Sequence, residues 1–431
     1  MGQAMDRRKF LEGVGGVTAA ALLGSCSETS PPPARRATDA GQSSAPPGDE
    51  WDRIRTDFLY PDDVGYFNTG TLGATPRPVV DAVARHLAEN EAFIPIWDFR
   101  DEGGEGSPLT GYRPLRAYVD PVAQMIGADP EEIALVQNAT FGMNFAANGL
   151  DLAAGDEVLI TDQEHPGGEC PWLLLAERRG IVVKKVPVAP PVASADEIVA
   201  GFERAIGPRT KVLVASQLTS GLAILLPAAR LSTLARERGL FSVIDGAQVL
   251  GQLRIDVHAI GCDLYITSPH KWLCAPKGTG VLYVRREVQD RLWTTLASAW
   301  WNDKTKGAGR FHQYGTGNLS LLEGLRAAVA FQERIGFDRI ETRDRALTAR
   351  LRDGLAAIRK VTLNSPASPE LTACVTNFSL EGKTGDQIQD ALWRRRIRVR
   401  AVGPGVRCGT HYYCREAEID RILEGVSELA G

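Results

Sequence analysis

Two side chains of opposite charge follow strand-like runs in the second half of the chain. Lys271 lies shortly after the apolar run 264–267, and Asp245 ends the run that begins at 241. Because ligands gather at the carboxyl ends of the strands in open α/β sheets, these two side chains should share one site. An amine can hold an aldehyde as a Schiff base, and a carboxylate can keep a ring nitrogen protonated. Taken singly, a solvated lysine and a helix-capping carboxylate explain the two residues equally well.

Anion-binding groups follow another strand-like run, 133–136. Ala139 and Thr140 begin a helical pattern there, and the unsatisfied N–H groups and dipole of a helix N-terminus bind anions. Thr140 alone would pass for an ordinary helix cap. His165 follows the run 158–160 and could lie flat on a cofactor ring, although a single loop histidine is usually a surface residue. Amine, carboxylate and phosphate donors together predict a site for pyridoxal 5'-phosphate (PLP).

The order of these motifs resembles the class V aminotransferase family, fold type I PLP enzymes that include cysteine desulfurases and isopenicillin N epimerase-like proteins. The similarity covers roughly residues 66–429. It implies that Lys271 forms the Schiff base, that His165 stacks on the ring, and that both are catalytic. It also implies that Asp245 pairs with the pyridine nitrogen, that Gln248 contacts the ring hydroxyl, and that Ala139, Thr140, Ser268 and His270 bind the phosphate.

The same resemblance extends to the substrate and to a second subunit. Segment 311–316 is similar to a loop that binds the neighbouring subunit's phosphate, so Thr316 implies a homodimer with shared active sites. Arg407 lies in a segment like the one that carries the substrate-carboxylate arginine, and its planar fork matches a carboxylate. The alternative is an exposed arginine in an arginine-rich region. Asn68 lies in a segment that lines the substrate pocket in the family.

Two departures bear on the reaction. Desulfurases carry a nucleophilic cysteine a few residues past the arginine equivalent to Arg400, but residues 401–405 contain no cysteine. Ser220 stands where those enzymes have an asparagine near the ring, and segment 270–278 is most similar to the epimerase-like branch. The cysteines nearest the motifs are expected to be buried as small hydrophobes; they are Cys274, Cys408 and Cys414.

Strand-like and helical runs alternate along the body of the chain, which predicts an α/β fold with a mainly parallel sheet. The resemblance implies PLP fold type I, with seven strands sandwiched by helices in a large domain, residues 66–305. Residues 51–65 and 306–431 would form a smaller α+β domain. Further strands are expected at 182–186, 212–214, 281–284, 376–380 and 397–400, and helices over 319–358 with a break near Gly336, at 387–395 and from Ala417 onward.

The first fifty residues differ in character from the rest. Residues 1–26 read as a twin-arginine signal, with Arg7 and Arg8 before an apolar stretch that is too short for a conventional membrane span. This predicts export by the twin-arginine machinery, to the periplasm or to an anchored position outside the cytoplasmic membrane. Residues 23–26 resemble a lipid-attachment box that would acylate Cys26, the alternative being ordinary cleavage nearby. Residues 27–50 have the composition of a flexible linker.

Composition excludes several other classes. The net charge of −4 and the pI near 6.0 give no electrostatic case for nucleic-acid binding. The seven cysteines are scattered, without metal-ligand spacing, and removal of Cys26 leaves six. We therefore expect no metal site and no required disulfide.

The predicted function is PLP-dependent chemistry at the amino-bearing carbon of an amino acid or small peptide in the cell envelope. Return of the α-proton to the same carbon gives epimerisation, and its delivery to the cofactor gives transamination. One alternative is a PLP-dependent lyase of desulfurase or elimination type. Another is a non-catalytic envelope protein that keeps the fold and only binds ligands.

Overall fold

A seven-stranded sheet forms the centre of the computed structural model, which describes residues 50–96, 115–188 and 194–431. Its strand order is β2-β8-β7-β6-β5-β3-β4, and all neighbours are parallel except those of β8, which is antiparallel to both β2 and β7. The strands are β2 (Ile133–Val136), β3 (Glu157–Thr161), β4 (Val182–Val186), β5 (Thr210–Ser216), β6 (Phe241–Asp245), β7 (Leu264–Thr267) and β8 (Gly280–Val284). The predicted α/β fold with a mainly parallel seven-stranded sheet is confirmed.

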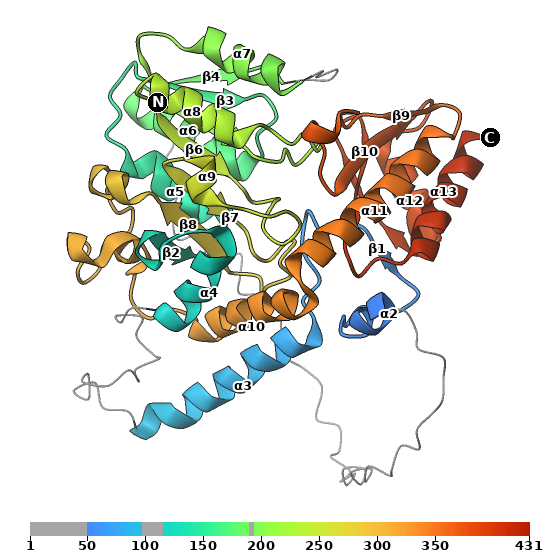
Figure 1. Cartoon of the computed structure of the whole chain (residues 1–431), viewed down its shortest axis with the longest axis horizontal. Helices are drawn as coiled ribbons and strands as arrows, with labels where there is room; N and C mark the ends of the chain where they lie inside the picture. Colours follow the sequence, from blue (N-terminus) through green and yellow to red (C-terminus); the bar gives the residue numbers. More distant parts are fainter. Residues whose placement is uncertain (1–49, 97–114, 189–193) are drawn as a thin grey trace, which may run out of the picture. The chain divides into compact units, whose positions relative to one another are not determined.

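Helices lie on both faces of this sheet (Figure 1), and an apolar cluster fills the space between each helical layer and the sheet. Along β5, Leu213 packs in one apolar cluster and Val214 in the other, because successive side chains of a strand point to opposite faces. The first face is covered by α4 (Arg116–Ile126), α7 (Ala195–Ala205), α8 (Ala228–Glu237) and α10 (Leu319–Ile335), and the second by α5 (Ala139–Gly149) and α6 (Pro166–Arg179). Helix α10 also packs along α3 (Arg77–Phe93), and the short α9 (Val257–Ile260) leads into β7.

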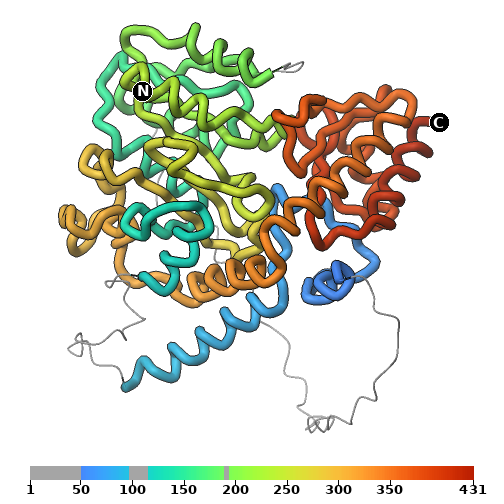
Figure 2. The backbone as a smooth tube through the Cα atoms, viewed as in Figure 1, coloured from blue at the N-terminus to red at the C-terminus, as the bar shows by residue number. Residues whose placement is uncertain are grey.

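The C-terminal part builds a second, antiparallel sheet in the order β12-β13-β10-β9. Its own apolar cluster includes Leu351, Ile388 and Ile422. The strands are β9 (Val361–Leu363), β10 (Val375–Leu380), β12 (Arg400–Val402) and β13 (Gly405–Gly409), and the helices are α11 (Phe337–Ala356), α12 (Gly385–Arg394) and α13 (Glu416–Ala430). Figure 2 shows the blue N-terminal segment running beside this part, where β1 (Gly65–Tyr66) pairs in parallel with β11 (Ile397–Arg398).

The helical stretch predicted over 319–358 ends and restarts at Gly336, whose φ of 98° suits glycine. The strand predicted at 397–400 is wrong as a single element. It divides at Val399 into β11, which pairs with β1, and β12, which pairs with β13. The remaining described elements are α2 (Glu50–Arg55) and the 3-10 helices η1 (Ile94–Ile96), η2 (Pro130–Glu132), η3 (Arg286–Arg291), η4 (Lys304–His312) and η5 (Pro369–Leu371).

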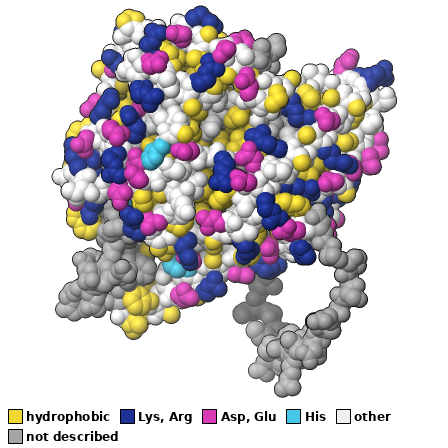
Figure 3. Space-filling view, viewed as in Figure 1, with side chains coloured by type: hydrophobic (Ala, Val, Ile, Leu, Met, Phe, Trp, Pro, Cys, Tyr) yellow, Lys and Arg dark blue, Asp and Glu magenta, His cyan; other side chains and the backbone are white. Residues whose placement is uncertain are grey.

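Positive and negative side chains are intermixed over the face seen in Figure 3. Several form surface ion pairs, such as Arg396 with Asp63 at 2.8 Å. Within the described ranges, no helix is both long and apolar enough to span a membrane. The predicted signal (1–26), Cys26 and all but Glu50 of the predicted linker lie outside the described residues, and the predicted domain boundaries at 65/66 and 305/306 stay predictions.

Candidate active site

A cavity of about 840 Å³ lies where the strands β3, β5, β6 and β7 end. The second sheet contributes to its wall through β12 and β13. Nine of the eleven predicted site residues line this cavity: Ala139, Thr140, His165, Asp245, Gln248, Ser268, His270, Lys271 and Arg407. Segments far apart in sequence therefore meet at the carboxyl edge of the sheet, as expected for this fold class.

Lys271 lies in the turn after β7, where its backbone N–H donates to the Ser268 carbonyl at 3.1 Å. Burial lowers the pKa of Lys271 to about 8, against the attraction of Asp245 and with a smaller contribution from the charge of Arg407. An ordinary lysine has a pKa of about 10.4. A larger fraction of the Lys271 amine is therefore uncharged near neutral pH, which is the form that attacks an aldehyde.

Asp245 ends β6 and is buried. Its Oδ1 accepts the backbone N–H of Ala247 at 2.8 Å. Burial raises the pKa of Asp245, while that hydrogen bond and the charges of Lys271 and His165 oppose the rise. A buried carboxylate is stable when a cation pairs with it, and a protonated pyridine nitrogen is such a cation.

Two glycines, Gly167 and Gly168, let helix α6 approach the carboxylate of Asp245. A Cβ placed on Gly168, in α6, would lie 3.1 Å from Asp245 Oδ2 and 3.7 Å from Glu164 Oε2. A Cβ on Gly167 would lie 2.5 Å from Thr140 Oγ1. Larger residues at these two positions would intrude on the cavity wall.

The N-terminus of α5 supplies the anion-binding end of the cavity. Asn138 caps it by accepting the N–H of Phe141 at 3.1 Å. The Ala139 N–H donates to Ser268 Oγ at 3.0 Å, so the Ser268 hydroxyl keeps its own hydrogen available for another acceptor. Thr140 also lines this end. These donors and the helix dipole suit a phosphate.

His270 is half-buried and His165 keeps an exposed edge, yet partial desolvation lowers the pKa of both. Burial, followed by the charge of Lys271, lowers the pKa of His270 to about 4, and the same two causes lower that of His165. His165 caps α6, and its Nδ1 accepts the N–H of Gly167 at 3.0 Å. A neutral ring therefore carries its proton on Nε2. Stacking by His165 and phosphate binding by His270 stay predictions.

Gln248 reaches the cavity with its amide already engaged. Its Nε2 donates to the Gly70 carbonyl at 2.8 Å, and its Oε1 accepts the indole N–H of Trp272 at 3.0 Å. One Nε2 hydrogen remains for a ring hydroxyl. Gln248 thus links the N-terminal segment to the residue that follows Lys271.

Arg407 is held by three groups from two segments. Its Nη1 donates to the Ser220 carbonyl at 2.6 Å, and its Nη2 donates to Thr71 Oγ1 at 2.8 Å and to Asn68 Oδ1 at 3.5 Å. Burial, followed by the charge of Arg400, lowers the pKa of Arg407 to about 10. The alternative of an exposed surface arginine is wrong, because only 7% of Arg407 is exposed. Asn68 does not line the cavity but orients Arg407.

Thr316 lies apart from this cavity. It lines a second cavity of about 470 Å³, together with His312 and Tyr314. The contact of Thr316 with a neighbouring subunit's phosphate stays a prediction.

Three further charged residues of the cavity, Asp162, Glu164 and Arg400, were not predicted. Glu164 accepts hydrogen bonds from Ser216 Oγ at 2.5 Å and Thr161 Oγ1 at 2.6 Å. Burial raises the pKa of Glu164 to about 7, and the charge of Asp245 adds to the rise. Arg400 projects into the cavity wall from β12. The available signal for Glu164 was its position beside His165 at a strand end.

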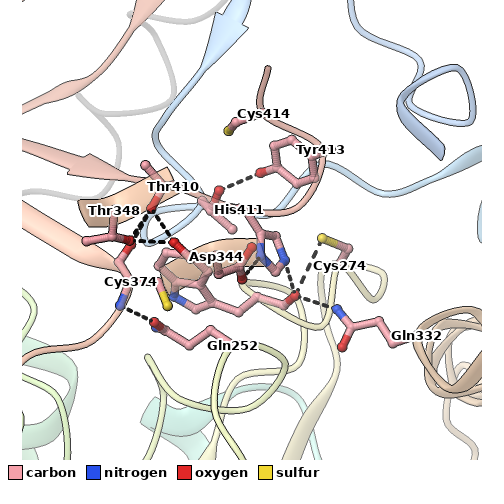
Figure 4. Close-up of polar contacts among 12 residues, drawn as sticks. Gln252, Cys274, Gln332, Asp344, Thr348, Cys374, Thr410, His411, Tyr413 and Cys414 are labelled. Carbon is pink, nitrogen blue, oxygen red and sulfur yellow. Dashed lines mark hydrogen bonds and ion pairs between the residues drawn. The ribbon is translucent and has the colours of Figure 1, made fainter. Parts of the chain in front are cut away.

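The residue after Lys271 is fixed by a buried ion pair (Figure 4). The Trp272 carbonyl accepts hydrogen bonds from His411 Nε2 at 2.7 Å and from Gln332 Nε2 at 2.8 Å. His411 Nδ1 lies 2.7 Å from Asp344 Oδ2, and both side chains are fully buried. Burial favours a neutral imidazole, but the attraction of Asp344 and its hydrogen bond outweigh burial and raise the pKa of His411 to about 10. Helix α11 is thereby tied to the turn that carries Lys271.

Replacing Asp344 with asparagine should lower the free energy of unfolding by about 3–5 kcal/mol, because the substitution leaves the buried imidazolium of His411 without its counter-charge. Urea denaturation followed by tryptophan fluorescence measures this loss. Thr348→Val is the matched control, since Thr348 lies on the same helix and its hydroxyl bonds the backbone carbonyl of Asp344 at 2.7 Å and Thr410 Oγ1 at 2.5 Å, but not the Asp344 carboxylate. It should cost about 1 kcal/mol. Equal losses in the two variants would show that the pair carries no charge.

The cysteines near the motifs are buried, as predicted for Cys274, Cys408 and Cys414. Burial raises the pKa of Cys408 to about 12 and also raises that of Cys414. None of the described residues that line the 840 Å³ cavity is a cysteine. In the described part of the chain, no His, Cys, Asp and Glu residues cluster as a metal site would require.

The chain's donors fit PLP at both ends of the cavity. Lys271 is half-buried and Asp245 is buried. The charge of each shifts the pKa of the other. Asp245 keeps Oδ2 beside the cavity, and the α5 N-terminus offers the phosphate donors. In this arrangement Lys271 would bind the aldehyde, Asp245 the ring nitrogen, and Thr140 and Ser268 the phosphate.

Residues 114–422 match the family described as aminotransferase class-V. The isopenicillin N epimerase of Amycolatopsis lactamdurans is 33% identical over 414 residues, covering 88% of this chain and 98% of that protein. A probable cysteine desulfurase of Xylella fastidiosa (strain 9a5c) is 29% identical over 418 residues, covering 90% and 97%.

Solved structures share the fold. A mutant of C-DES with glycine covalently linked to its PLP cofactor superimposes with a TM-score of 0.77, at 24% identity, over 87% of this chain and 99% of that one. The apo cysteine desulfurase of Thermococcus onnurineus NA1 gives a TM-score of 0.75, at 26% identity, over 88% and 97%.

Proposed function

The chain belongs to the class V aminotransferase family and uses pyridoxal 5'-phosphate, and we propose that it moves the α-proton of an amino acid or small peptide. The observation that carries the proposal is the cavity in which Lys271, with its lowered pKa, shares the wall with Asp245 and Arg407. The reaction would be an epimerisation or a transamination.

Bound PLP supplies an electron sink for the substrate's α-carbon. Arg407 holds the substrate carboxylate with two parallel hydrogen bonds, and Asn68 and Thr71 orient the guanidinium. The amine of Lys271 takes the α-proton as general base and returns it as general acid, for which a pKa near the working pH is effective. Asp245 stabilises positive charge at the ring nitrogen position.

Relatives named as cysteine desulfurases make a lyase the second candidate. Sulfur transfer through an enzyme thiol is disfavoured, because the cavity wall at Val402, Gly403 and Pro404 offers no cysteine. Elimination from the β- or γ-carbon needs no such thiol. A lyase activity at this site would therefore be an elimination. The lowered pKa of Lys271 in the cavity disfavours a protein that only binds ligands.

Incubation of the purified holoenzyme with amino acids in heavy water separates these candidates. We expect α-deuteration without release of sulfide or pyruvate, and none with Lys271→Ala, because that variant lacks the proton carrier. Mirror-image product identifies epimerisation, and keto acid identifies transamination. Release of sulfide or alanine, or of pyruvate together with free ammonia, would instead assign the lyase. If none of the amino acids gained deuterium, the proposal would be contradicted.

We also infer that the chain is exported and that it works as a homodimer. Support for export comes from Arg7 and Arg8 before an apolar stretch, and Cys26 would anchor the mature chain. Cell fractionation of a variant with lysine at both arginine positions tests export, and metabolic labelling with palmitate tests the anchor. Thr316, which lies outside the chain's own cavity, supports the dimer. Sedimentation analysis tests its mass.

A further inference from the structure

Arg400 and Arg407 face each other across two strands of the second sheet. Strand β12 is antiparallel to β13, and Arg400 is the register partner of Arg407. Directly opposed residues in such a pair project from the same face, with Cβ atoms about 4.5–5.5 Å apart. Both side chains line the 840 Å³ cavity. The fold therefore brings two guanidinium groups to one wall of the site.

Like charges in directly opposed positions destabilise a sheet unless something compensates them. Among the described residues, no carboxylate lies within ion-pair distance of either arginine. Two nearby arginines have acidic partners, Arg395 in Glu424 and Arg396 in Asp63. The pair on β12 and β13 is thus an uncompensated positive pair that faces the substrate cavity.

The two arginines differ in how they are held. Arg407 is buried and oriented by Ser220, Thr71 and Asn68, as a group that fixes the α-carboxylate must be. Arg400 is exposed, and its guanidinium is free to reach a ligand group farther from the reacting carbon. The acidic residues of the cavity are Asp162 and Glu164, in the segment after β3, and Asp245, at the end of β6. None of them lies on β12, so an anionic substrate end is favoured there.

We propose that Arg400 binds a second carboxylate, so that the substrate is an amino acid or small peptide with an anionic group at the end remote from its α-carbon. The inference rests on the proposed function, because it assigns the α-carboxylate to Arg407. A cavity of about 840 Å³ is in the range that holds ligands of drug size.

Matched substrate pairs test this assignment. The probes are glutamate with glutamine and γ-glutamylglutamate with γ-glutamylglutamine, and the readout is the rate of α-deuteration by the holoenzyme. The acidic member of each pair should react at least tenfold faster. Arg400→Gln should remove this preference by slowing the acidic member tenfold or more, with less than a twofold change for the neutral one. Arg407→Gln should slow both members alike.

Arg398→Gln is the control for loss of a neighbouring positive charge. Arg398 stacks on Trp393 with its Cζ 3.6 Å from the ring centroid and does not line the cavity, so its loss should leave the preference unchanged. Equal rates on both members in the wild type, or an equal slowing of both by Arg400→Gln, would overturn the inference.

A binding measurement separates failure of the inference from failure of the proposed function. Glutarate and adipate should perturb the cofactor absorbance at concentrations at least tenfold lower than butyrate and hexanoate, and Arg400→Gln should abolish that difference. If this holds while no amino acid is deuterated, the proposed reaction is wrong and the anion site stands. If dicarboxylates and monocarboxylates bind alike, Arg400 has no such role.

Discussion

Replacement of Lys271 with alanine is expected to remove the covalent attachment of PLP and to slow proton transfer at the α-carbon on the order of 10³-fold or more. Lys271 is the amine that lies in the cavity with Asp245, and its pKa is lowered to about 8. The visible absorbance of the reconstituted protein and the α-deuteration rate measure the two effects.

Lys277→Ala is the matched control. Lys277 is only six positions away, but its Nζ donates to the Gly73 carbonyl at 2.8 Å and to Thr75 Oγ1 at 3.0 Å, outside the cavity. This variant should keep the coloured cofactor. A coloured Lys271→Ala protein with wild-type activity would contradict the assignment.

The lowered pKa of Lys271 also predicts a pH dependence for capture of PLP by the apoprotein. Because only the uncharged amine attacks the aldehyde, the rate should rise roughly tenfold for each pH unit below 8 and level off above it. A plateau that begins near pH 10 would mean that burial does not lower the pKa of Lys271.

Asp245→Asn is expected to retain PLP and to lose about 10²- to 10³-fold in turnover, the usual effect of removing one preorganised electrostatic group. The phosphate donors at the α5 N-terminus and Lys271 are unchanged in this variant, so cofactor binding should persist while the ring nitrogen loses its counter-charge. Titration with PLP and single-turnover rates measure binding and chemistry separately.

Asp263→Asn controls for the loss of a buried carboxylate elsewhere. Asp263 is buried, but it pairs with Arg285 at 2.5 Å and bonds Ser242, away from the cavity lining. Its loss should reduce stability without changing the rate per bound cofactor. If Asp245→Asn behaved in the same way, Asp245 would have only a structural role.

The strand ends were predictable from sequence because local patterns encode them. Apolar runs such as 133–136 and 264–267 are strands with those same bounds, and the rule that ligands gather at carboxyl ends then placed Lys271 beside Asp245. Motif order also located Arg407, which lies in β13, a strand that was not predicted. Its run is short and contains two glycines, and pairing with β10 and β12 stabilises it.

Contacts between segments far apart in the chain could not be predicted from local sequence patterns. Nothing local shows that Asp344 meets His411, 67 positions away, or that Arg400 opposes Arg407 across a turn. The ring contact predicted for Gln248 stays a prediction, and the sequence did not show that its amide also bonds Trp272 and Gly70. Such arrangements depend on tertiary packing, which overrides local propensity.

Every proposed step depends on covalent attachment of the cofactor to the amine of Lys271. Peptide mass spectrometry of the PLP-loaded protein after borohydride reduction tests it most directly. We expect one stable pyridoxyl adduct, on Lys271, absent from Lys271→Ala and retained in Lys277→Ala. An unmodified Lys271 in fully loaded protein, or an adduct on another lysine, would contradict the account.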